Sequence, residues 1–306
     1  MSRGRRSQRH ERPFHVIASS SHWEDVSTVI VTYNSAAVIA TCLQSVKASK
    51  QVIVVDNAST DETCDIIRKI LPAAQIIQNK RNRGFGSAVN QGMAIVETDF
   101  GFYFSPDAIL TDTAMQALTE AAEQYPKTAV FGPYLQNHEG MQELYVMGPD
   151  DIRHSSLDTV PGGHFSTWFV MGGFFLCRMT VWRDIGGFDE RIFLYNEDVD
   201  LCLRFTRGGH HLAVIPNAVV IHAGGQSSKV TWRVKWRKDW HQTWSHLYMM
   251  AKYGNPVDAK VKARETLRQQ GWKALLYLLL LRFDRVRGNA AKAAAAASYL
   301  RGRGAH

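Results

Sequence analysis

The chain has 306 residues, 45% of them hydrophobic, and a formal net charge of +8. A chain of this length and apolar content can bury a substantial core, which excludes an intrinsically disordered protein. Its cysteines are far apart in the sequence and form no CxxC pair, so we expect reduced, buried thiols and a cytoplasmic protein. They are Cys42, Cys64, Cys177 and Cys202.

The two ends of the chain differ from its middle in charge. Residues 1–25 are polar and rich in arginine near the start, without the apolar stretch of a secretory signal, and we expect them to form a disordered basic arm. Residues 257–306 contain eleven Lys or Arg against three Asp or Glu, an excess that equals the net charge of the whole chain. The basic character therefore belongs to a C-terminal extension, expected to be helical and to cover residues 251–306.

The C-terminal extension contains the run "GWKALLYLLLLRF" at residues 271–283. This run is shorter than the roughly 20 apolar residues that span a bilayer. Two interpretations remain open: an interfacial helix on anionic lipid, which would make the protein peripheral on the inner face of the cytoplasmic membrane, or a helix packed at a domain edge. The sequence pI of 9.3 also suggests nucleic acid, but no recognisable binding module supports that partner.

Apolar runs and helical patterns alternate over the first half of the chain. The pattern predicts helices at residues 36–48 and 59–71, the second capped by Ser59 or Thr60. Strands that alternate with helices indicate an α/β fold with a mostly parallel, Rossmann-like sheet flanked by helices. The predicted strands cover residues 27–34, 51–59, 74–80 and 100–107.

Polar residues follow the predicted strands, where open parallel sheets bind their ligands. Asp56 suits a hydrogen bond to a ribose or a base, although a cap or an Asx-turn is the structural alternative. Asp107 offers a hard oxygen ligand to a divalent cation, and His222 follows a later strand and is a second candidate ligand. The loop at residues 82–92 lacks the GxGxxG fingerprint, which disfavours an NAD site. The other polar residues at these strand ends are Thr32, Tyr33, Asn34, Asn57 and Ser105.

Three acids gather in "RIFLYNEDVDLCLR", residues 191–204. If this segment is helical, Asp200 and Arg204 stand four residues apart and can pair on one face. Asp198 then points elsewhere, nearer Cys202. Glu197, Asp198 and Asp200 therefore need not share one role.

Six segments in this order resemble the inverting family-2 glycosyltransferases, and among them the bacterial rhamnosyltransferase-like branch, over residues 26–250. This resemblance implies a GT-A fold, with a nucleotide-sugar-binding half at 26–135 and an acceptor-binding half at 136–250. It also implies a nucleotide-diphosphate sugar donor, a divalent cation (Mg²⁺ or Mn²⁺) and one-step inversion at the anomeric carbon. The segments are "VIVTYNS", "VIVVDNASTD", "NRGFGSAVNQG", "FSPDAIL", "GGFFLCRMTVWRDIGGFDERIFLYNEDVDLCLR" and "VIHAGGQSS".

The resemblance also implies a role for individual residues. Asp198 matches the catalytic base, with Glu197 as its helper, and Asp107 with His222 matches the metal site. Ser105 stands where relatives commonly have Asn before Pro-Asp, and Asp107 is the one carboxylate of the motif. The acceptor pocket would include Trp168, Gly172 and Gly173. The nucleotide sugar would contact Thr32, Tyr33, Asn34, Asp56, Asn57, Arg83, Gly84, Asn90, Ser105 and Asp107.

The resemblance thus implies an enzyme that transfers a sugar onto a lipid-linked or polysaccharide acceptor in cell-surface glycan synthesis. L-rhamnose from its thymidine diphosphate carrier is the donor that the branch suggests. The alternative is a nucleotide-sugar-binding scaffold without activity, for which the reduced Ser105-Pro106-Asp107 motif is the only indication.

Overall fold

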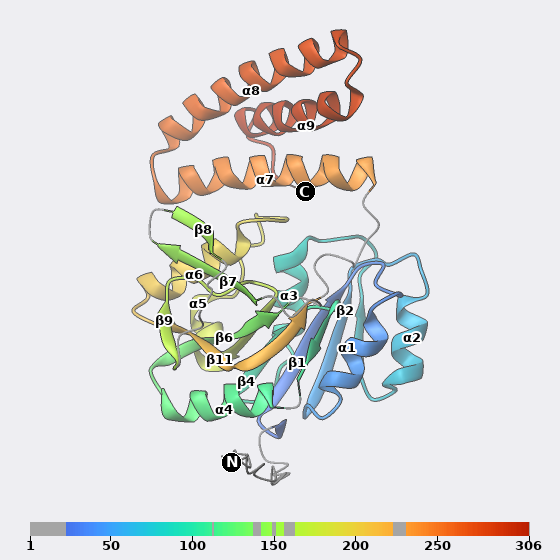
Figure 1. The fold of residues 1–306 in the computed structure, drawn as a ribbon, viewed down its shortest axis with the longest axis vertical. Helices are drawn as coiled ribbons and strands as arrows, with labels where there is room; N and C mark the ends of the chain where they lie inside the picture. The colour runs from blue at the N-terminus through green and yellow to red at the C-terminus, as the bar shows by residue number, and fades with distance from the viewer. Residues whose placement is uncertain are drawn as a thin grey trace, which may run out of the picture.

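The computed structural model describes residues 23–111, 113–136, 142–148, 151–155, 163–222 and 231–305, with the backbone alone for 142–148 and 151–155 (Figure 1). The arm expected at residues 1–25 lies almost wholly outside this part of the chain, and so does the end of the "VIHAGGQSS" segment.

A twisted sheet forms the centre of the molecule, with the strand order β3-β2-β1-β4-β10-β6-β11-β5. The pairs β2–β3, β1–β2, β1–β4 and β6–β11 are parallel, whereas β10 is antiparallel to both of its neighbours and β5 is antiparallel to β11. Six strands of this path therefore run in one direction, which confirms the predicted α/β class. The described strands are β1 (Val26–Thr32), β2 (Gln51–Asp56), β3 (Gln75–Gln78), β4 (Phe100–Phe104), β5 (Ala108–Leu110), β6 (Thr128–Gln136), β7 (Gln142–Gly148), β8 (Asp151–Ser155), β9 (Phe165–Thr167), β10 (Phe174–Arg178) and β11 (His211–His222).

Helices cover both faces of this sheet because successive side chains of a strand point to opposite faces. Ile30 packs in a cluster with residues of α1, α2 and α4, whereas its neighbour Val29 packs in a second cluster with residues of α3, α5 and α6. The strand side chains in both clusters are almost fully buried. The described helices are α1 (Ile39–Val46), α2 (Thr63–Ile70), α3 (Phe85–Met93), α4 (Ala114–Gln124), α5 (Met179–Ile185), α6 (Glu197–Arg207), α7 (Trp232–Tyr253), α8 (Pro256–Leu279) and α9 (Phe283–Leu300).

The start of α2 differs from the prediction. The helix begins at Thr63 after Glu62, so neither Ser59 nor Thr60 is its N-cap. Both residues instead bind Asn34 at the end of β1: the Ser59 hydroxyl accepts from the Asn34 amide at 2.8 Å, and the Thr60 amide donates to the Asn34 side chain at 2.8 Å. A tertiary contact between two strand ends thus replaces a local cap.

Three long helices form the C-terminal part of the chain (Figure 1). α7 lies across the end of the sheet region, and α8 and α9 pack on its far side. The alanine-rich sequence of α9 allows this close packing, with Ala295 against Trp244 and Ala296 against Leu247. α7 also runs through the boundary expected at residue 250, so the extension is continuous with the preceding region. The four cysteines are free and buried, as predicted.

Candidate active site

The strand directions bring the predicted site residues to one edge of the sheet. β1 ends at Thr32, β2 ends at Asp56, and β11 ends at His222. β10 runs the other way, so the residues before it, Gly172 and Gly173, lie at this same edge. Parallel strands bind ligands at their carboxyl ends, and this edge is therefore the candidate active site.

A pocket of about 880 Å³ opens at this edge. Thr32, Tyr33 and Asn34 line it from the end of β1, together with residues that follow β2 and β4. Among the predicted nucleotide-sugar contacts, Asp56, Arg83, Asn90 and Asp107 lie outside the pocket lining. The predicted contacts that do line it are Thr32, Tyr33, Asn34, Asn57, Gly84 and Ser105.

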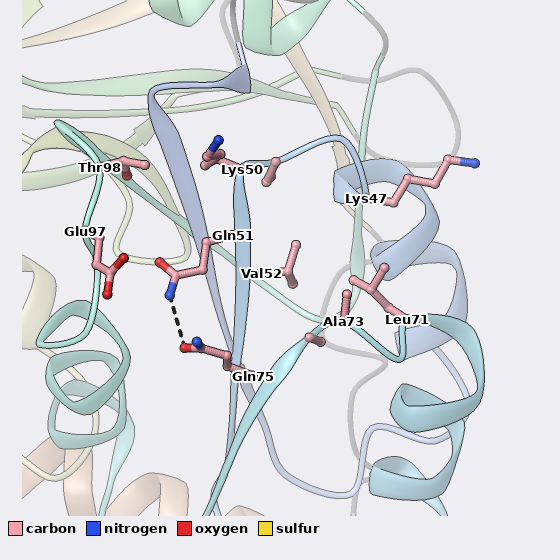
Figure 2. Close-up of a pocket in the computed structure, with 11 residues that line it drawn as sticks. Lys47, Lys50, Gln51, Val52, Leu71, Ala73, Gln75, Glu97 and Thr98 are labelled. Atoms are coloured by element: carbon pink, nitrogen blue, oxygen red, sulfur yellow. Dashed lines mark hydrogen bonds between the residues drawn. The ribbon is translucent and has the colours of Figure 1, made fainter.

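A second pocket, of about 550 Å³, lies at the opposite edge, near the amino ends of β2 and β3 (Figure 2). Figure 2 shows Gln51 and Gln75 joined by a hydrogen bond of 3.0 Å, with Lys47 pointing away from them. None of the predicted site residues lines this pocket.

Asn57 organises one wall of the larger pocket. Its side-chain nitrogen donates to Asn82 Oδ1 and to the Gly84 carbonyl, each at 3.0 Å, and its oxygen accepts from the Arg83 amide at 2.9 Å. Gly84 has a φ of +89°, and an added Cβ would lie 2.6 Å from the Phe193 carbonyl oxygen. Only glycine fits this position, which brings the loop backbone close to the pocket.

Asp56 is 2% exposed, beneath the pocket rather than in its lining. One carboxylate oxygen accepts from the Thr32 hydroxyl at 3.1 Å, and the other accepts from the Ser59 amide at 3.1 Å. The second contact comes from the N–H three residues further along the chain, one residue beyond an Asx-turn, so it is a local contact of a different kind from that turn. A contact of Asp56 with a ribose or base stays a prediction.

Asn90 and Arg83 both reach toward the segment after α5. The Asn90 amide donates to the Phe188 carbonyl at 2.9 Å and accepts from the Phe188 N–H at 2.8 Å. Arg83 lies 3.8 Å from the Glu190 carboxylate. In this structure the two residues join α3 and its preceding loop to the 188–190 segment.

Asp107 and His222 come together because β5 pairs with β11 in a register that sets Ala108 opposite His222. His222 Nε2 lies 3.6 Å from Asp107 Oδ1, and the Ser105 hydroxyl donates to the same oxygen at 2.6 Å. Burial opposes ionisation of Asp107, but the contacts with His222 and Ser105 outweigh it and hold the pKa of Asp107 below its ordinary value.

This pair supplies one carboxylate oxygen and one imidazole nitrogen, which suit a divalent cation. The Nδ1 atom of His222 is buried and has no hydrogen-bond partner among the described residues. No group of three or more His, Cys, Asp or Glu that could hold a metal ion occurs in the part of the chain that the structure describes. The protein thus fits a cation through two ligands, and further oxygen ligands would have to come from substrate or water.

The acid cluster follows a turn with an unusual backbone. Tyr195 and Asn196 have φ values of +67° and +64°, and α6 begins directly after them at Glu197. Two successive left-handed residues other than glycine are strained, and such strain often occurs at functional sites. Tyr195 also lines the larger pocket, so the turn joins the pocket wall to the acids.

Glu197 is 8% exposed, and its Oε2 atom has no hydrogen-bond partner among the described residues. Burial, together with the neighbouring Asp198 carboxylate, raises the pKa of Glu197 to about 8. A carboxylate in this environment holds its proton near neutral pH and can exchange it in catalysis.

Asp198 faces the segment before β10. Its Oδ1 accepts from the Val199 amide at 2.8 Å, and its Oδ2 accepts a longer bond of 3.4 Å from the Gly172 amide. Burial raises the pKa of Asp198, although these N–H groups oppose part of the change. A Cβ on Gly172 would come within 2.7 Å of the Asp198 Cβ, whereas one on Gly173 would meet nothing within 4 Å. Gly172 therefore makes room for Asp198.

Asp200 makes different contacts from Glu197 and Asp198. It is 0% exposed and accepts from Arg204 Nε at 2.8 Å, which confirms the expected pair. It also contacts the Lys252 ammonium and accepts from the Tyr253 hydroxyl at 2.8 Å. Lys252 lies 2.7 Å from Asp189 as well, so these contacts attach the end of α7 to α6 and to the 188–190 segment.

α7 contributes to the pocket, which was not expected from the sequence. Arg237, Lys238 and His241 line it from this helix. The Lys238 ammonium lies 5.7 Å from the centre of the Tyr195 ring, and neither Arg237 nor Lys238 forms an ion pair with another described residue. The interleaved basic and aromatic residues of "TWRVKWRKDWHQTW" (231–244) were the available signal. The acceptor candidate Trp168 is 54% exposed and does not line the pocket.

Comparison with known proteins supports an assignment at the level of family. N-acetylglucosaminyl-diphospho-decaprenol L-rhamnosyltransferase of Mycobacterium tuberculosis is 27% identical over 237 residues, which cover 65% of this chain and 76% of that protein. The O-antigen chain rhamnosyltransferase WbaN of Salmonella anatum is 25% identical over 56% of each chain. Among solved structures, S. aureus TarS 1–349 in complex with UDP-GlcNAc superposes with a TM-score of 0.56 at 15% identity, covering 91% of this chain and 92% of that one.

The TarS likeness confirms the expected GT-A fold, and the two curated relatives confirm the resemblance to the rhamnosyltransferase-like branch. The model of the family described as "Glycosyl transferase family 2" matches residues 27–186, which is more than half of the chain. The chain therefore belongs to glycosyl transferase family 2.

Proposed function

We propose that the protein transfers a sugar, with inversion, from a nucleotide-diphosphate donor to a hydroxyl of a lipid-linked or polysaccharide acceptor. L-rhamnose from dTDP-L-rhamnose is the proposed donor, because two of the relatives are named as rhamnosyltransferases. The observation that carries the proposal is the pocket of about 880 Å³ at the carboxyl ends of the strands, with the Glu197–Asp198 pair beside its Tyr195 wall.

Asp198 is the proposed general base. Its carboxylate takes the proton of the acceptor hydroxyl as the hydroxyl oxygen attacks the anomeric carbon. The bond from that carbon to the diphosphate breaks, and the nucleoside diphosphate leaves with the electron pair. General-base help of this kind contributes about 10²–10⁴-fold. The raised pKa of Asp198 supports this role, because it makes the carboxylate a better proton acceptor. Glu197 orients its neighbour or the acceptor hydroxyl.

The leaving diphosphate requires positive charge. Arg237 and Lys238 supply it from α7, on the pocket side opposite the strand ends. Asp107 and His222 would hold a divalent cation, which when bound supplies further charge to the departing phosphates. Charge that acts on the leaving group stabilises the transition state more than the bound donor.

The acceptor side of the proposal is supported by a relative whose name contains diphospho-decaprenol, a lipid-linked substrate. We propose that this chain meets such an acceptor at the inner face of the cytoplasmic membrane, through peripheral contact of the C-terminal extension. No helix among the described residues has the length and hydropathy needed to cross a bilayer.

A donor screen tests the proposal. The purified chain is incubated with dTDP-L-rhamnose, UDP-GlcNAc and other nucleotide sugars, with and without Mg²⁺ or Mn²⁺, and thermal unfolding is followed. A donor at 100 times its dissociation constant stabilises the folded chain by about 2.7 kcal/mol. Release of nucleoside diphosphate with a lipid-linked acceptor would confirm transfer. Binding without release under any metal and acceptor condition would favour the inactive scaffold instead.

A further inference from the structure

The connection between α8 and α9 exposes an unusual amount of apolar surface. We call this surface the apolar tip. The side chains at the end of α8 and in the following turn are the most exposed, at 74% for Leu279 and 73% for Leu281. The residues of the apolar tip are Trp272, Leu275, Leu276, Leu278, Leu279, Leu280, Leu281 and Phe283.

No residue of the apolar tip belongs to a hydrophobic core cluster of the described residues. The buried residues of α8 are Ala259 and Ala263, both near its start, where the helix meets α7 and α9. The leucines at its other end, which leads into the turn before α9 (Figure 1), are between 46% and 74% exposed. Contiguous exposed apolar surface on a folded chain marks a contact with a membrane or a partner. α8 does pack on α7 and α9, as one of the two interpretations left open by the sequence expects, but this packing leaves the side chains of the apolar tip at least 46% exposed.

Basic side chains surround the apolar tip. Lys273, Arg282, Arg285 and Arg287 lie within or directly after it, against the single acid Asp284. The Arg285 guanidinium donates a hydrogen bond to the Tyr277 hydroxyl at 3.2 Å, which places it against the end of α8. Exposed leucine and tryptophan with arginine and lysine at their margin form the pattern of a segment that enters the interface of an anionic bilayer.

The apolar tip stands at the same end of the molecule as the candidate active site. The Arg287 guanidinium lies 5.1 Å from the Trp232 ring centre, so the start of α9 packs on the start of α7. Two to six residues further along α7, Val234, Arg237 and Lys238 line the larger pocket. Trp232 is itself 51% exposed, which extends apolar surface from the tip toward the pocket.

We propose that the apolar tip inserts into the interface of an anionic phospholipid membrane and turns the mouth of the pocket toward that surface. A second copy of the chain is the less suitable occupant, because a twofold contact through this face would set its arginines against one another. The orientation of the pocket toward a lipid-linked acceptor rests on the proposed function, whereas insertion of the tip does not.

Vesicle binding by the full-length chain tests this proposal without any sugar donor. Co-sedimentation is measured with phosphatidylcholine vesicles and with vesicles that also contain phosphatidylglycerol, at low and high salt. The test variant is L279S/L281S. The matched control is V257S/V261S, which removes exposed aliphatic side chains at 64% and 45% exposure from the far end of α8.

We expect the wild-type chain and the control to bind the vesicles that contain phosphatidylglycerol, more weakly at high salt. The tip variant should need about tenfold or more lipid for half-binding, since two leucines no longer enter the bilayer. Equal binding of the tip variant and the wild type, or no binding to anionic vesicles, would overturn the proposal. So would a wild-type dimer in solution that the tip variant converts to a monomer, because the occupant would then be a second copy. Because the assay uses no donor, failed sugar transfer with intact vesicle binding would refute the proposed function alone.

Discussion

The sheet edge and the α7–α9 helices use their apolar residues in opposite ways. In β1 and β2, side chains such as Ile30, Val29 and Ile53 are 0% exposed and pack on both faces of the sheet. In the C-terminal helices, small alanines are buried, whereas the leucines of the apolar tip face outward. The sheet buries its apolar side chains in its own core, whereas the C-terminal helices leave the leucines of the apolar tip exposed. We therefore expect the sheet edge to carry out the reaction and the helices to hold that edge at a membrane surface.

The largest expected effect is on the chemistry of the sheet edge. Asp198→Asn removes the proposed base and should slow sugar transfer by about 10²–10⁴-fold, with folding and donor binding retained. The measurement is nucleoside diphosphate release under saturating donor. Asp184→Asn, on the exposed side of α5, is the matched control and should transfer at the wild-type rate. A normal rate for Asp198→Asn would show that the base is another group.

The second largest expected effect is on the contacts that attach α7 to the sheet region. Lys252→Met removes the cation that contacts both Asp189 and Asp200, of which Asp200 is 0% exposed. Because a buried carboxylate then loses a partner, the free energy of unfolding should fall by about 3 kcal/mol in urea titration. Lys260→Met on the exposed surface of α8 should change it little. Equal stability of the two variants would mean that α7 is held by packing alone.

The third prediction concerns Glu197 at the sheet edge and how the stability of the chain depends on pH. The folded chain keeps the Glu197 proton up to a pKa of about 8, whereas an ordinary glutamate in the unfolded chain releases it near 4.5. Between these values the unfolded chain binds fewer protons, so the free energy of unfolding falls as the pH rises. Glu197→Gln should remove this decline and be more stable than the wild type by about 2–4 kcal/mol above pH 8. Parallel pH profiles for the two proteins would contradict the raised pKa.

The smallest expected effect concerns Arg237, a residue of α7 that lines the larger pocket at the sheet edge. Arg237→Gln should weaken binding of the nucleoside diphosphate about tenfold, since one charge opposite the phosphates is lost. The binding should also become less sensitive to salt. Lys235→Gln is the control, because Lys235 lines a separate small pocket between α7 and α9. Calorimetric titration measures the affinity of each variant for the nucleoside diphosphate. Identical affinities would show that Arg237 of α7 does not contribute to the donor site.

The position of the strand-end residues was predictable because it depends only on local sequence patterns and on the common direction of parallel strands. β-branched runs predict the strands, and parallel strands end at one edge, so Thr32, Asn57 and Ser105 had to approach one another. The pairing of Asp200 with Arg204 follows from helix periodicity in the same way. Asn34 shows where this argument fails: its contacts with Ser59 and Thr60 replaced the predicted cap, because two strand ends meet only in the folded chain.

The amino-acid sequence by itself determined the α/β class, the family resemblance, the residues at the strand ends and the basic character of the C-terminal extension. Only the tertiary structure decided that Asn34 meets Ser59 and Thr60, that Arg237 and Lys238 reach the pocket, and that the leucines after Trp272 are exposed. The physical reason is that periodicity and composition act over a few residues. Contacts between distant segments, and the choice of which apolar surface is buried, depend on how the whole chain packs.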